Sequence, residues 1–371
     1  MNKLKIALVK QEVYQDLYVC PVTEKDPGQI LFSSMGRVGP IALMSDLNAD
    51  FYIVKEESNQ ETRIYQKVIP HIAPYLHLLK TETLDKIPGQ EFKSPGSPYP
   101  NGKYAVSCYT IDWGQYDIVI SINISLPTQL ILKYPQTLFA YMIGEANMAT
   151  GKARFGYDAT LNQMARGRIS HKCGAIDFPY TFVAKDTLEK IMQQYLGRPS
   201  ARKGIFMEIN STTERPVTRI PDHFQPLADA GYEIILHQQK IADNLKNIYD
   251  AKYFVKMGGR SIRGNSVAEA VSLGTLAIMN RDEVIHHELI IDECNVKTMD
   301  EMISLINRLE NDPELYRTLQ QKQRQVLHTY FFDAPLQSLI NCLKEKRGLS
   351  KPRTYSRWNR LFDNLYFLKL R

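Results

Sequence analysis

The segment from Lys256 to Asn280, KMGGRSIRGNSVAEAVSLGTLAIMN, decides the fold of this chain. It predicts the end of a strand, a glycine-rich turn, a short apolar helix that stops at Gly274, and a second strand. The glycines at positions 258, 259 and 264 let the backbone approach a ligand closely, and the amides at the start of a helix lack partners within it. A negatively charged group such as a phosphate fits this turn.

Charged side chains strengthen this interpretation of the segment. Arg260 and Arg263 flank the turn, where each can donate charged hydrogen bonds to a phosphate. The helix is predicted to begin at Ser266, because Ser266 and Glu269 have the spacing of a capping box. The residues expected to form the anion site are Arg260, Arg263, Gly264, Asn265, Ser266 and Val267.

The same segment resembles the nucleotide-sugar site of glycosyltransferases of the GT-B fold, where a glycine-rich turn meets a helix that begins with a Glu-Ala pair. The resemblance implies that Glu269 binds the ribose hydroxyls of the donor and that the preceding amides bind its diphosphate. A role for Glu269 in the capping box alone is the alternative, and the two roles are compatible. Many retaining members carry a second Glu eight positions earlier, where this chain has Ser261. Neither the stereochemistry nor the donor sugar therefore follows from the resemblance.

Length and composition indicate a two-domain globular protein. The chain has 371 residues, of which 44% are apolar and 23% are charged, enough for two domains with separate cores. No run of about 18 or more apolar residues occurs, so no membrane-spanning helix is predicted. The five cysteines are scattered and predict neither a disulfide framework nor a zinc site, and we expect a cytoplasmic protein. A net charge of +6 is too small and too dispersed to indicate nucleic acid as a partner.

Apolar runs alternate with helical segments in both halves of the chain. The runs at 4–9, 50–55 and 116–124 are typical of buried parallel strands, and the pattern resumes at residue 205, which predicts an α/β protein. A basic, breaker-rich connection at 197–204 separates a first domain, residues 1–196, from a second domain, residues 203–345. The GT-B resemblance is specific over 203–345 and weak over 1–195. It implies two Rossmann-like, doubly wound domains that face a cleft.

Local signals predict several helices. Asp186 to Tyr195 has an amphipathic pattern, and Arg63 to Leu79 is also compatible with a helix. Thr298 and Glu301 have capping-box spacing at the start of a predicted helix, and Asp312 before Pro313 predicts the start of a longer one.

Two further residues of the second half follow predicted strands. Arg215 ends the polar segment that follows the strand at 205–209, and His237 follows the strand at 232–236. Since the carboxyl ends of parallel strands meet at one edge, both residues are expected near the anion site. Arg215 can complete a diphosphate clamp, and His237 can contact the base or a phosphate. A solvated loop and a structural histidine are the alternatives.

The first half offers three carboxylates as the catalytic group. Glu145 lies in a glycine-containing turn after an apolar strand, where it can act as a general base or stabilise developing positive charge. Asp158 and Asp177 have similar surroundings in the sequence. Each of the three can instead form a turn or a cap, so the choice stays open. The resemblance implies only that this half holds the acceptor.

No metal or cofactor is expected. His286 and His287 precede Glu288, but side chains of adjacent residues diverge on a helix or a strand, which disfavours a shared metal ion. The chain has no Asp-x-Asp pair of the type found in metal-dependent glycosyltransferases. We expect the nucleotide-sugar to be a substrate.

The expected function is that of a glycosyltransferase, which moves a sugar from a nucleotide-activated donor to a hydroxyl of a saccharide or glycolipid acceptor. A role in the assembly of bacterial surface polysaccharide or glycolipid rests on the resemblance alone. A nucleotide-sugar epimerase and a catalytically inactive nucleotide-binding module are the alternatives.

The C-terminal residues 346–371 predict a basic amphipathic helix. Apolar residues recur at helical spacing among many basic ones; they are Trp358, Leu361, Phe362, Leu365 and Leu368. Such a helix suits an anionic membrane surface, so peripheral attachment to the inner face of the membrane is one expectation. Packing of the last helix on the first domain is the other.

Overall fold

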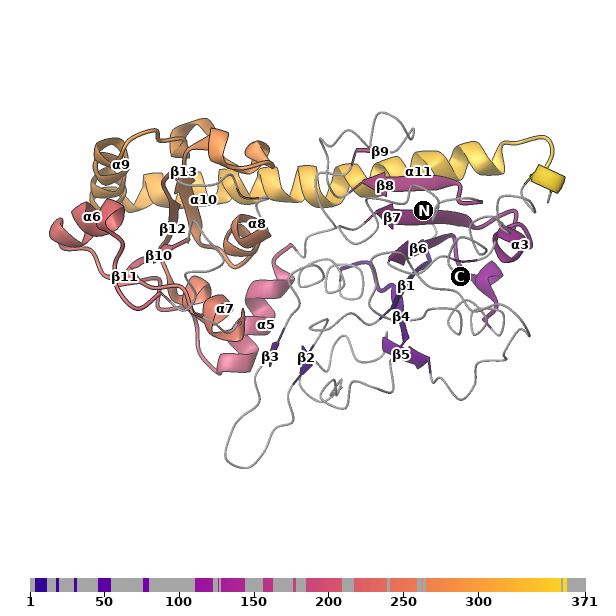
Figure 1. The fold of residues 1–371 in the computed structure, drawn as a ribbon, viewed down its shortest axis with the longest axis horizontal. Coiled ribbons are helices and arrows are strands. Elements are labelled where there is room, and N and C mark those ends of the chain that lie inside the picture. Colours follow the sequence, from indigo (N-terminus) through magenta and orange to yellow (C-terminus); the bar gives the residue numbers. More distant parts are fainter. Residues whose placement is uncertain are drawn as a thin grey trace, which may run out of the picture. The chain divides into compact units, whose positions relative to one another are not determined.

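The computed structural model divides the chain into two units (Figure 1). Unit 1 comprises Met1–Tyr14, Pro40–Phe182 and Asp333–Arg371, and unit 2 comprises Gln15–Gly39 and Val183–Phe332. The structure describes residues 4–11, 18–19, 30–31, 46–54, 76–79, 111–122, 126, 128–143, 156–162, 176–177, 185–208, 217–238, 241–258, 262, 265–354 and 356–358.

Unit 1 contains a parallel sheet with the strand order β5-β4-β1-β6-β7-β8-β9. The chain adds strands first on one side of β1 and then on the other, so the sheet is doubly wound. Its topological switch point lies between β1 and β6, and ligands of such sheets bind beyond the carboxyl ends of the strands at this point. The strands are β1 (Ile6–Gln11), β4 (Asp50–Val54), β5 (Leu76–Leu79), β6 (Ile118–Ile122), β7 (Leu138–Ile143), β8 (Ala159–Asn162) and β9 (Ile176–Asp177).

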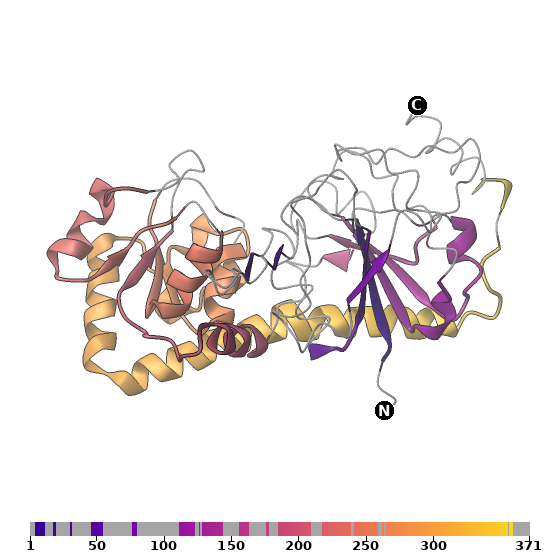
Figure 2. The same cartoon turned by 90° about the horizontal axis from the view of Figure 1, so that it is seen from below.

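The apolar runs predicted as strands form the core of unit 1. Trp113, at the start of the 3-10 helix η5 (Trp113–Gln115), is fully buried against residues of β1, β6 and β7 and of the short helix α3 (Thr128–Ile131). The helix α11 (Ala334–Arg347) packs against β7 (Figure 2). The last described part of the chain therefore belongs to the packing of unit 1.

Unit 2 contains a second parallel sheet, with the strand order β11-β10-β12-β13. Its winding also reverses once, so its topological switch point lies between β10 and β12. The strands are β10 (Ile205–Met207), β11 (Ile234–Ile235), β12 (Tyr253–Lys256) and β13 (Leu276–Met279). Among its helices are α5 (Thr187–Leu196), α6 (Gln225–Asp229), α7 (Ile241–Asp250), α8 (Asn265–Ser272), α9 (Met299–Asn311) and α10 (Pro313–His328). A two-residue antiparallel pair, β2 (Tyr18–Val19) with β3 (Ile30–Leu31), is grouped with this unit.

The α/β architecture predicted from the sequence is confirmed, and so are several local signals. At the start of α9, Thr298 Oγ1 accepts from Glu301 N at 3.2 Å and Glu301 Oε2 accepts from Thr298 N at 3.3 Å, which completes the capping box. Asp312 Oδ1 accepts from Leu315 N at 2.9 Å at the start of α10.

Gly274 follows the end of α8, as predicted. Its φ of +82° lies in the left-handed region, and a Cβ there would collide with the guanidinium groups of Arg202 and Arg324. Only glycine fits this position without strain.

Three sequence predictions differ from the structure. Leu76–Leu79 pairs with β4 as a strand and is not helical, since a short apolar run alone cannot distinguish the two. Helix α8 begins at Asn265, so Ser266 lies inside it and is not its N-cap. The domain limits also differ, because α5 groups with unit 2 and residues 333–345 group with unit 1.

The predicted limit between residues 345 and 346 falls inside α11, which continues to Arg347. Residues 359–371, most of the predicted C-terminal amphipathic helix, lie outside the described residues. Among the helices of the described residues, none is both long enough and apolar enough to cross a bilayer.

Candidate functional site

The candidate site lies at the carboxyl edge of the sheet of unit 2. Glu208 follows β10, His237 follows β11 by two residues, and Lys256 ends β12. None of the three is more than 5% exposed. Burying an ionisable group costs free energy unless it is paired, so such groups concentrate where function requires them. Because β10 and β12 border the topological switch point, this edge is where the fold is expected to bind a ligand.

His237 is held between Glu208 and the first part of α7. His237 Nδ1 lies 2.8 Å from the carbonyl oxygen of Gln238 and 3.2 Å from Asn244 Nδ2. His237 Nε2 faces Glu208 Oε1 at 4.0 Å. Asn244 of α7 fixes the turn, since its Oδ1 accepts from Gln238 N at 2.7 Å and its Nδ2 donates to the Gln238 carbonyl at 2.8 Å.

Two backbone hydrogen bonds place Glu208 and Val217 at the same edge. Glu208 N donates to the carbonyl of Val255 on β12 at 2.9 Å, and Val217 N donates to the carbonyl of His237 at 3.0 Å. Arg215 lies outside the described residues, two positions before Val217.

The glycine-rich turn after β12 is anchored by Glu283, which ends the 3-10 helix η9 (Arg281–Glu283). Glu283 Oε2 is 2.7 Å from Lys256 Nζ, and Glu283 Oε1 accepts from Gly258 N at 2.9 Å. Lys256 Nζ also donates to the carbonyl of Gly258 at 2.6 Å. Gly258 has a φ of +71°, so glycine is required at this point of the turn.

Ile262, which follows the glycines at 258 and 259, is bound by residues in and just after η9. Ile262 N donates to the carbonyl of Glu283 at 2.8 Å, and Ile285 N donates to the carbonyl of Ile262 at 2.9 Å. Ile262 thus forms a parallel bridge with Val284. The predicted phosphate-binding residues Arg260, Arg263 and Gly264 lie outside the described residues.

Helix α8 starts after this turn and runs back to the amino edge of the sheet, where β13 begins. It is almost completely buried, with Val267 at 0% and Glu269 at 1% exposed, and Ser266 is half-buried in its first turn. Asn265 is the first helical residue, so the amides at this end are the ones that lack partners within the helix. The ribose contact of Glu269 stays a prediction.

The catalytic candidates of unit 1 do not lie at one place. Glu145 follows the end of β7 by two residues and lies outside the described residues, and Asp177 is the last residue of β9. Asp177 therefore lies at the carboxyl edge of the sheet. Asp158 immediately precedes β8 and therefore lies at the amino edge.

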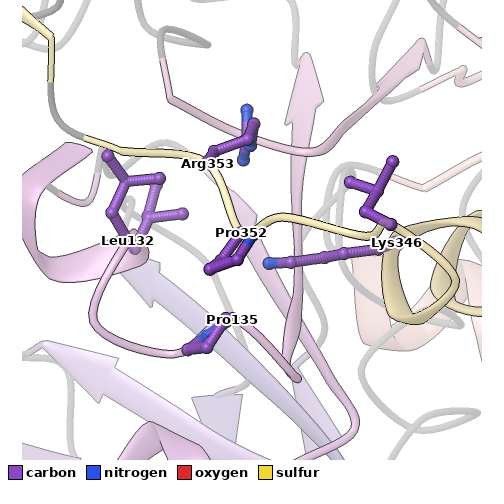
Figure 3. Close-up of a pocket in the computed structure, with 7 residues that line it drawn as sticks. Leu132, Pro135, Lys346, Pro352 and Arg353 are labelled. Atoms are coloured by element: carbon purple, nitrogen blue, oxygen red, sulfur yellow. The ribbon is translucent and has the colours of Figure 1, made fainter.

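Asp158 is occupied by contacts within unit 1. Its Oδ2 accepts from Phe139 N at 2.8 Å and lies 2.7 Å from Lys346 Nζ, and its Oδ1 pairs with Arg353. Lys346 and Arg353 line a small pocket together with Leu132, Pro135 and Pro352 (Figure 3). Burial lowers the pKa of Lys346, although Asp158 opposes this shift. These contacts favour a role for Asp158 in attaching the segment after α11, so Glu145 and Asp177 are the better catalytic candidates.

The histidines at 286 and 287 point in different directions, as predicted. His286 is 1% exposed and its ring contacts Phe331, whereas His287 is partly exposed and its Nε2 lies 3.3 Å from Glu288 Oε1. The part of the chain that the structure describes contains no group of three His, Cys, Asp or Glu side chains that could hold a metal ion.

Sequence reasoning did not single out Glu208, Asn244 or Glu283. Glu208 interrupts the apolar run Ile205–Ile209, and a charged residue that ends a buried strand at a switch point is a usable signal. The contact of Glu283 with Lys256 carries no comparable signal, because it joins residues that are 27 positions apart.

No protein-family model and no curated protein sequence matches the chain. Similar solved structures include the β-glucosyltransferase of phage T4, with 11% identity and a TM-score of 0.41 over 93% of this chain and 100% of that one. Sucrose-phosphate synthase from Thermosynechococcus elongatus has 12% identity and a TM-score of 0.45, over 93% of this chain and 99% of that one. TarM from S. aureus, in complex with UDP among other ligands, has 10% identity and a TM-score of 0.48, over 92% of this chain and 100% of that one. Glycosyltransferase structures are thus among those to which this chain is similar.

Proposed function

We propose that this protein is a glycosyltransferase that moves a sugar from a nucleotide-activated donor to a hydroxyl acceptor. One observation carries the proposal: a glycine-rich turn, anchored at both ends, leads from the topological switch point of unit 2 into the start of α8. In a doubly wound sheet, this is where backbone amides and a helix N-terminus meet a phosphate.

The residues of unit 2 supply charge and hydrogen bonds for the leaving nucleoside diphosphate. Arg215, Arg260 and Arg263, together with the amides from Asn265 to Val267, would neutralise the charge that builds on the phosphate as the bond to the sugar breaks. Glu269 would accept from the ribose hydroxyls. His237, whose Nε2 faces Glu208, would contact the base or a phosphate.

Unit 1 would hold the acceptor, a saccharide or a glycolipid, and supply the catalytic carboxylate. Glu145 comes two positions after the last residue of β7, and Asp177 is the last residue of β9. Either can take a proton from an acceptor hydroxyl or stabilise positive charge on the sugar. The reaction as proposed uses no resident cofactor or metal ion, and the nucleotide-sugar is a substrate.

The test of this proposal is a binding and turnover screen. Thermal-shift measurements with uridine, adenosine, guanosine, cytidine and thymidine diphosphates should show stabilisation by one of them, since a ligand at 100 times its Kd contributes about 2.7 kcal/mol. Nucleotide-sugars that contain this base should then be turned over, slowly with water and faster with an acceptor. Absence of stabilisation by every diphosphate would contradict the proposal.

The same screen separates the alternatives. An epimerase would convert the donor without any acceptor and without release of the nucleoside diphosphate. A nucleotide-binding module would bind the diphosphate tightly and leave every nucleotide-sugar intact.

Replacing Glu269 with glutamine is expected to weaken binding of the nucleoside diphosphate about tenfold, because the amide accepts from the ribose hydroxyls through one oxygen and without charge. Glutamine has nearly the same volume, so the melting temperature should stay close to that of the parent. Isothermal titration measures the affinity. Glu301→Gln, in the capping box of α9, is the matched control and should bind like the parent. Parental affinity in Glu269→Gln would remove Glu269 from the nucleotide site.

The basic C-terminal residues are proposed to attach the protein to an anionic membrane surface, a step that suits a role in surface-polysaccharide or glycolipid assembly. Lys346, Arg347 and Arg353 pair with carboxylates of unit 1, so they already have intramolecular partners. Trp358, beyond these contacts, is 65% exposed. Attachment would therefore use residues from about 356 onward, where basic residues near headgroups contribute about 1 kcal/mol each.

Deleting residues 356–371 is expected to abolish binding to vesicles that contain phosphatidylserine while leaving the melting temperature unchanged. The cut keeps Arg353, so the contacts of Asp158 are preserved. Co-sedimentation with anionic vesicles, compared with neutral ones, measures the effect. If the parent does not bind anionic vesicles and the deletion lowers the melting temperature, the tail packs on the protein instead.

A further inference from the structure

Gly258 is held on both of its peptide groups by one buried ion pair. Its N–H donates to Glu283 Oε1, and its carbonyl accepts from Lys256 Nζ, while Lys256 and Glu283 pair with each other at 2.7 Å. The carbonyl of Glu283 accepts from Ile262 N as well. One residue of η9 therefore anchors the start and the return of the glycine-rich turn.

Stability alone does not account for this arrangement. The side chain of Lys256 is 0% exposed and that of Glu283 is 16% exposed, so both charges lose much of their hydration on folding. A buried ion pair gains little net stability over apolar side chains of the same size, because the loss of hydration offsets the attraction. What the pair does achieve is a fixed orientation of the Gly258 peptide groups, at a residue with a φ of +71° whose type has the most conformational freedom to lose.

We propose that Glu283 is a positioning residue that, together with Lys256, fixes the peptide groups of Gly258, from which the chain leads to the start of α8, where a diphosphate is proposed to bind. The inference rests on the proposed function, because it assigns the turn to the nucleotide site. Preorganised donors bind an anion more tightly because less ordering remains to be done when the ligand arrives. Glu283 would contribute to affinity through Gly258 and without touching the nucleotide.

Two double variants isolate the hydrogen bond to Gly258. Lys256→Met with Glu283→Gln removes both charges and keeps an acceptor for the Gly258 N–H. Lys256→Met with Glu283→Leu removes both charges and also removes the acceptor. Both variants replace the ion pair with side chains of similar volume, a change that folded proteins tolerate. Any loss of electrostatic attraction to an anion is the same in the two variants.

The leucine variant is expected to bind the nucleoside diphosphate about tenfold more weakly than the glutamine variant. Isothermal titration with the uridine, adenosine, guanosine, cytidine and thymidine diphosphates measures both affinities. The melting temperature of the leucine variant should be slightly the lower of the two, because one hydrogen bond is lost. Glu293→Gln, which breaks the ion pair with Lys322 elsewhere in unit 2, is the matched control and should bind like the parent. Equal affinities of the two double variants would overturn the proposal.

Glu283→Asp covers the case in which the leucine variant does not fold. Aspartate keeps the charge but is one methylene shorter, so it cannot reach both Lys256 and Gly258 at their present distances. It is expected to weaken nucleotide binding and to leave the fold intact. Parental affinity in Glu283→Asp would also overturn the proposal.

Hydrogen exchange separates failure of this inference from failure of the proposed function. The amides of Gly258 and Ile262 should exchange faster in the leucine variant than in the glutamine variant, whether or not any nucleotide binds. If the parent binds no nucleoside diphosphate, the proposed function is wrong. If the amides of Gly258 and Ile262 exchange at the same rates in the leucine and glutamine variants, the anchoring role of Glu283 is wrong.

Discussion

Replacing Asp158 with alanine is expected to lower the free energy of unfolding of unit 1 by about 3 kcal/mol, because removing one member of a buried ion pair leaves the other charge uncompensated. The side chains of Asp158 and Lys346 are 7% and 11% exposed, so water cannot replace the lost contact. The backbone N–H of Phe139 also loses its acceptor. The loss should appear in unit 1 and leave nucleotide binding by unit 2 unchanged.

Tryptophan fluorescence during urea unfolding measures this effect in unit 1 alone, because the chain has two tryptophans and both belong to that unit. Trp113 is fully buried and gives the signal, whereas Trp358 is already exposed. The control is Arg347→Ala, which removes a more exposed ion pair with Asp117 and should cost less than about 1 kcal/mol. A small loss of stability in Asp158→Ala combined with a complete loss of transfer would return Asp158 to the catalytic candidates.

The features that the sequence predicted well depend on residues close to each other in the chain. The start of α9 follows from a Thr and a Glu three positions apart, and the end of α8 follows from one glycine with a positive φ. The strand β12 and the turn after it follow from an apolar run and the glycines at 258 and 259. Such contacts form within one or two turns of the chain, so a local pattern contains all the information.

The features that the sequence did not predict depend on distant partners. Leu76–Leu79 becomes a strand because β4 offers it an edge, and nothing in those four residues excludes a helix. Asp158 was a catalytic candidate because its structural role is not visible locally. Its partner Lys346 lies 188 positions further along the chain. The grouping of α11 with unit 1 has the same origin, since its packing against β7 is a long-range contact.

The candidate site also combines features that depend on local sequence with features that depend on distant partners. The turn, the helix after it and the position of His237 follow from local patterns and the rule for parallel sheets. The pairing of His237 with Glu208 and the anchoring of Gly258 by Glu283 follow only from the arrangement of β10, β11, β12 and η9. Sequence reasoning therefore predicted a position for the candidate site but not the long-range contacts among its described residues.

Topology favours Glu145 over Asp177 as the catalytic group proposed for unit 1. The switch point of the sheet lies between β1 and β6, and β7, which precedes Glu145, is the next strand after β6. Asp177 ends β9, which is three strands from β6. With neighbouring strands about 4.8 Å apart, the end of β7 lies about 5 Å and the end of β9 about 14 Å from β6. An acceptor bound at the switch point would therefore be closer to the end of β7, which Glu145 follows by two positions in the sequence.

Replacing Glu145 with glutamine is expected to lower the rate of transfer at least about 100-fold, because a positioned general base contributes a factor of about 100 to 10,000 and an amide cannot accept the proton. Affinity for the nucleoside diphosphate should stay at the parental value, since the proposed nucleotide site belongs to unit 2. Steady-state kinetics with the donor found in the screen should thus show a fall in kcat with little change in the KM of the donor. The matched control, Asp177→Asn, should keep kcat within about threefold of the parent on the same argument from strand spacing. Full activity in Glu145→Gln together with loss of activity in Asp177→Asn would assign the catalytic role to Asp177 and move the acceptor toward the β9 end of the sheet.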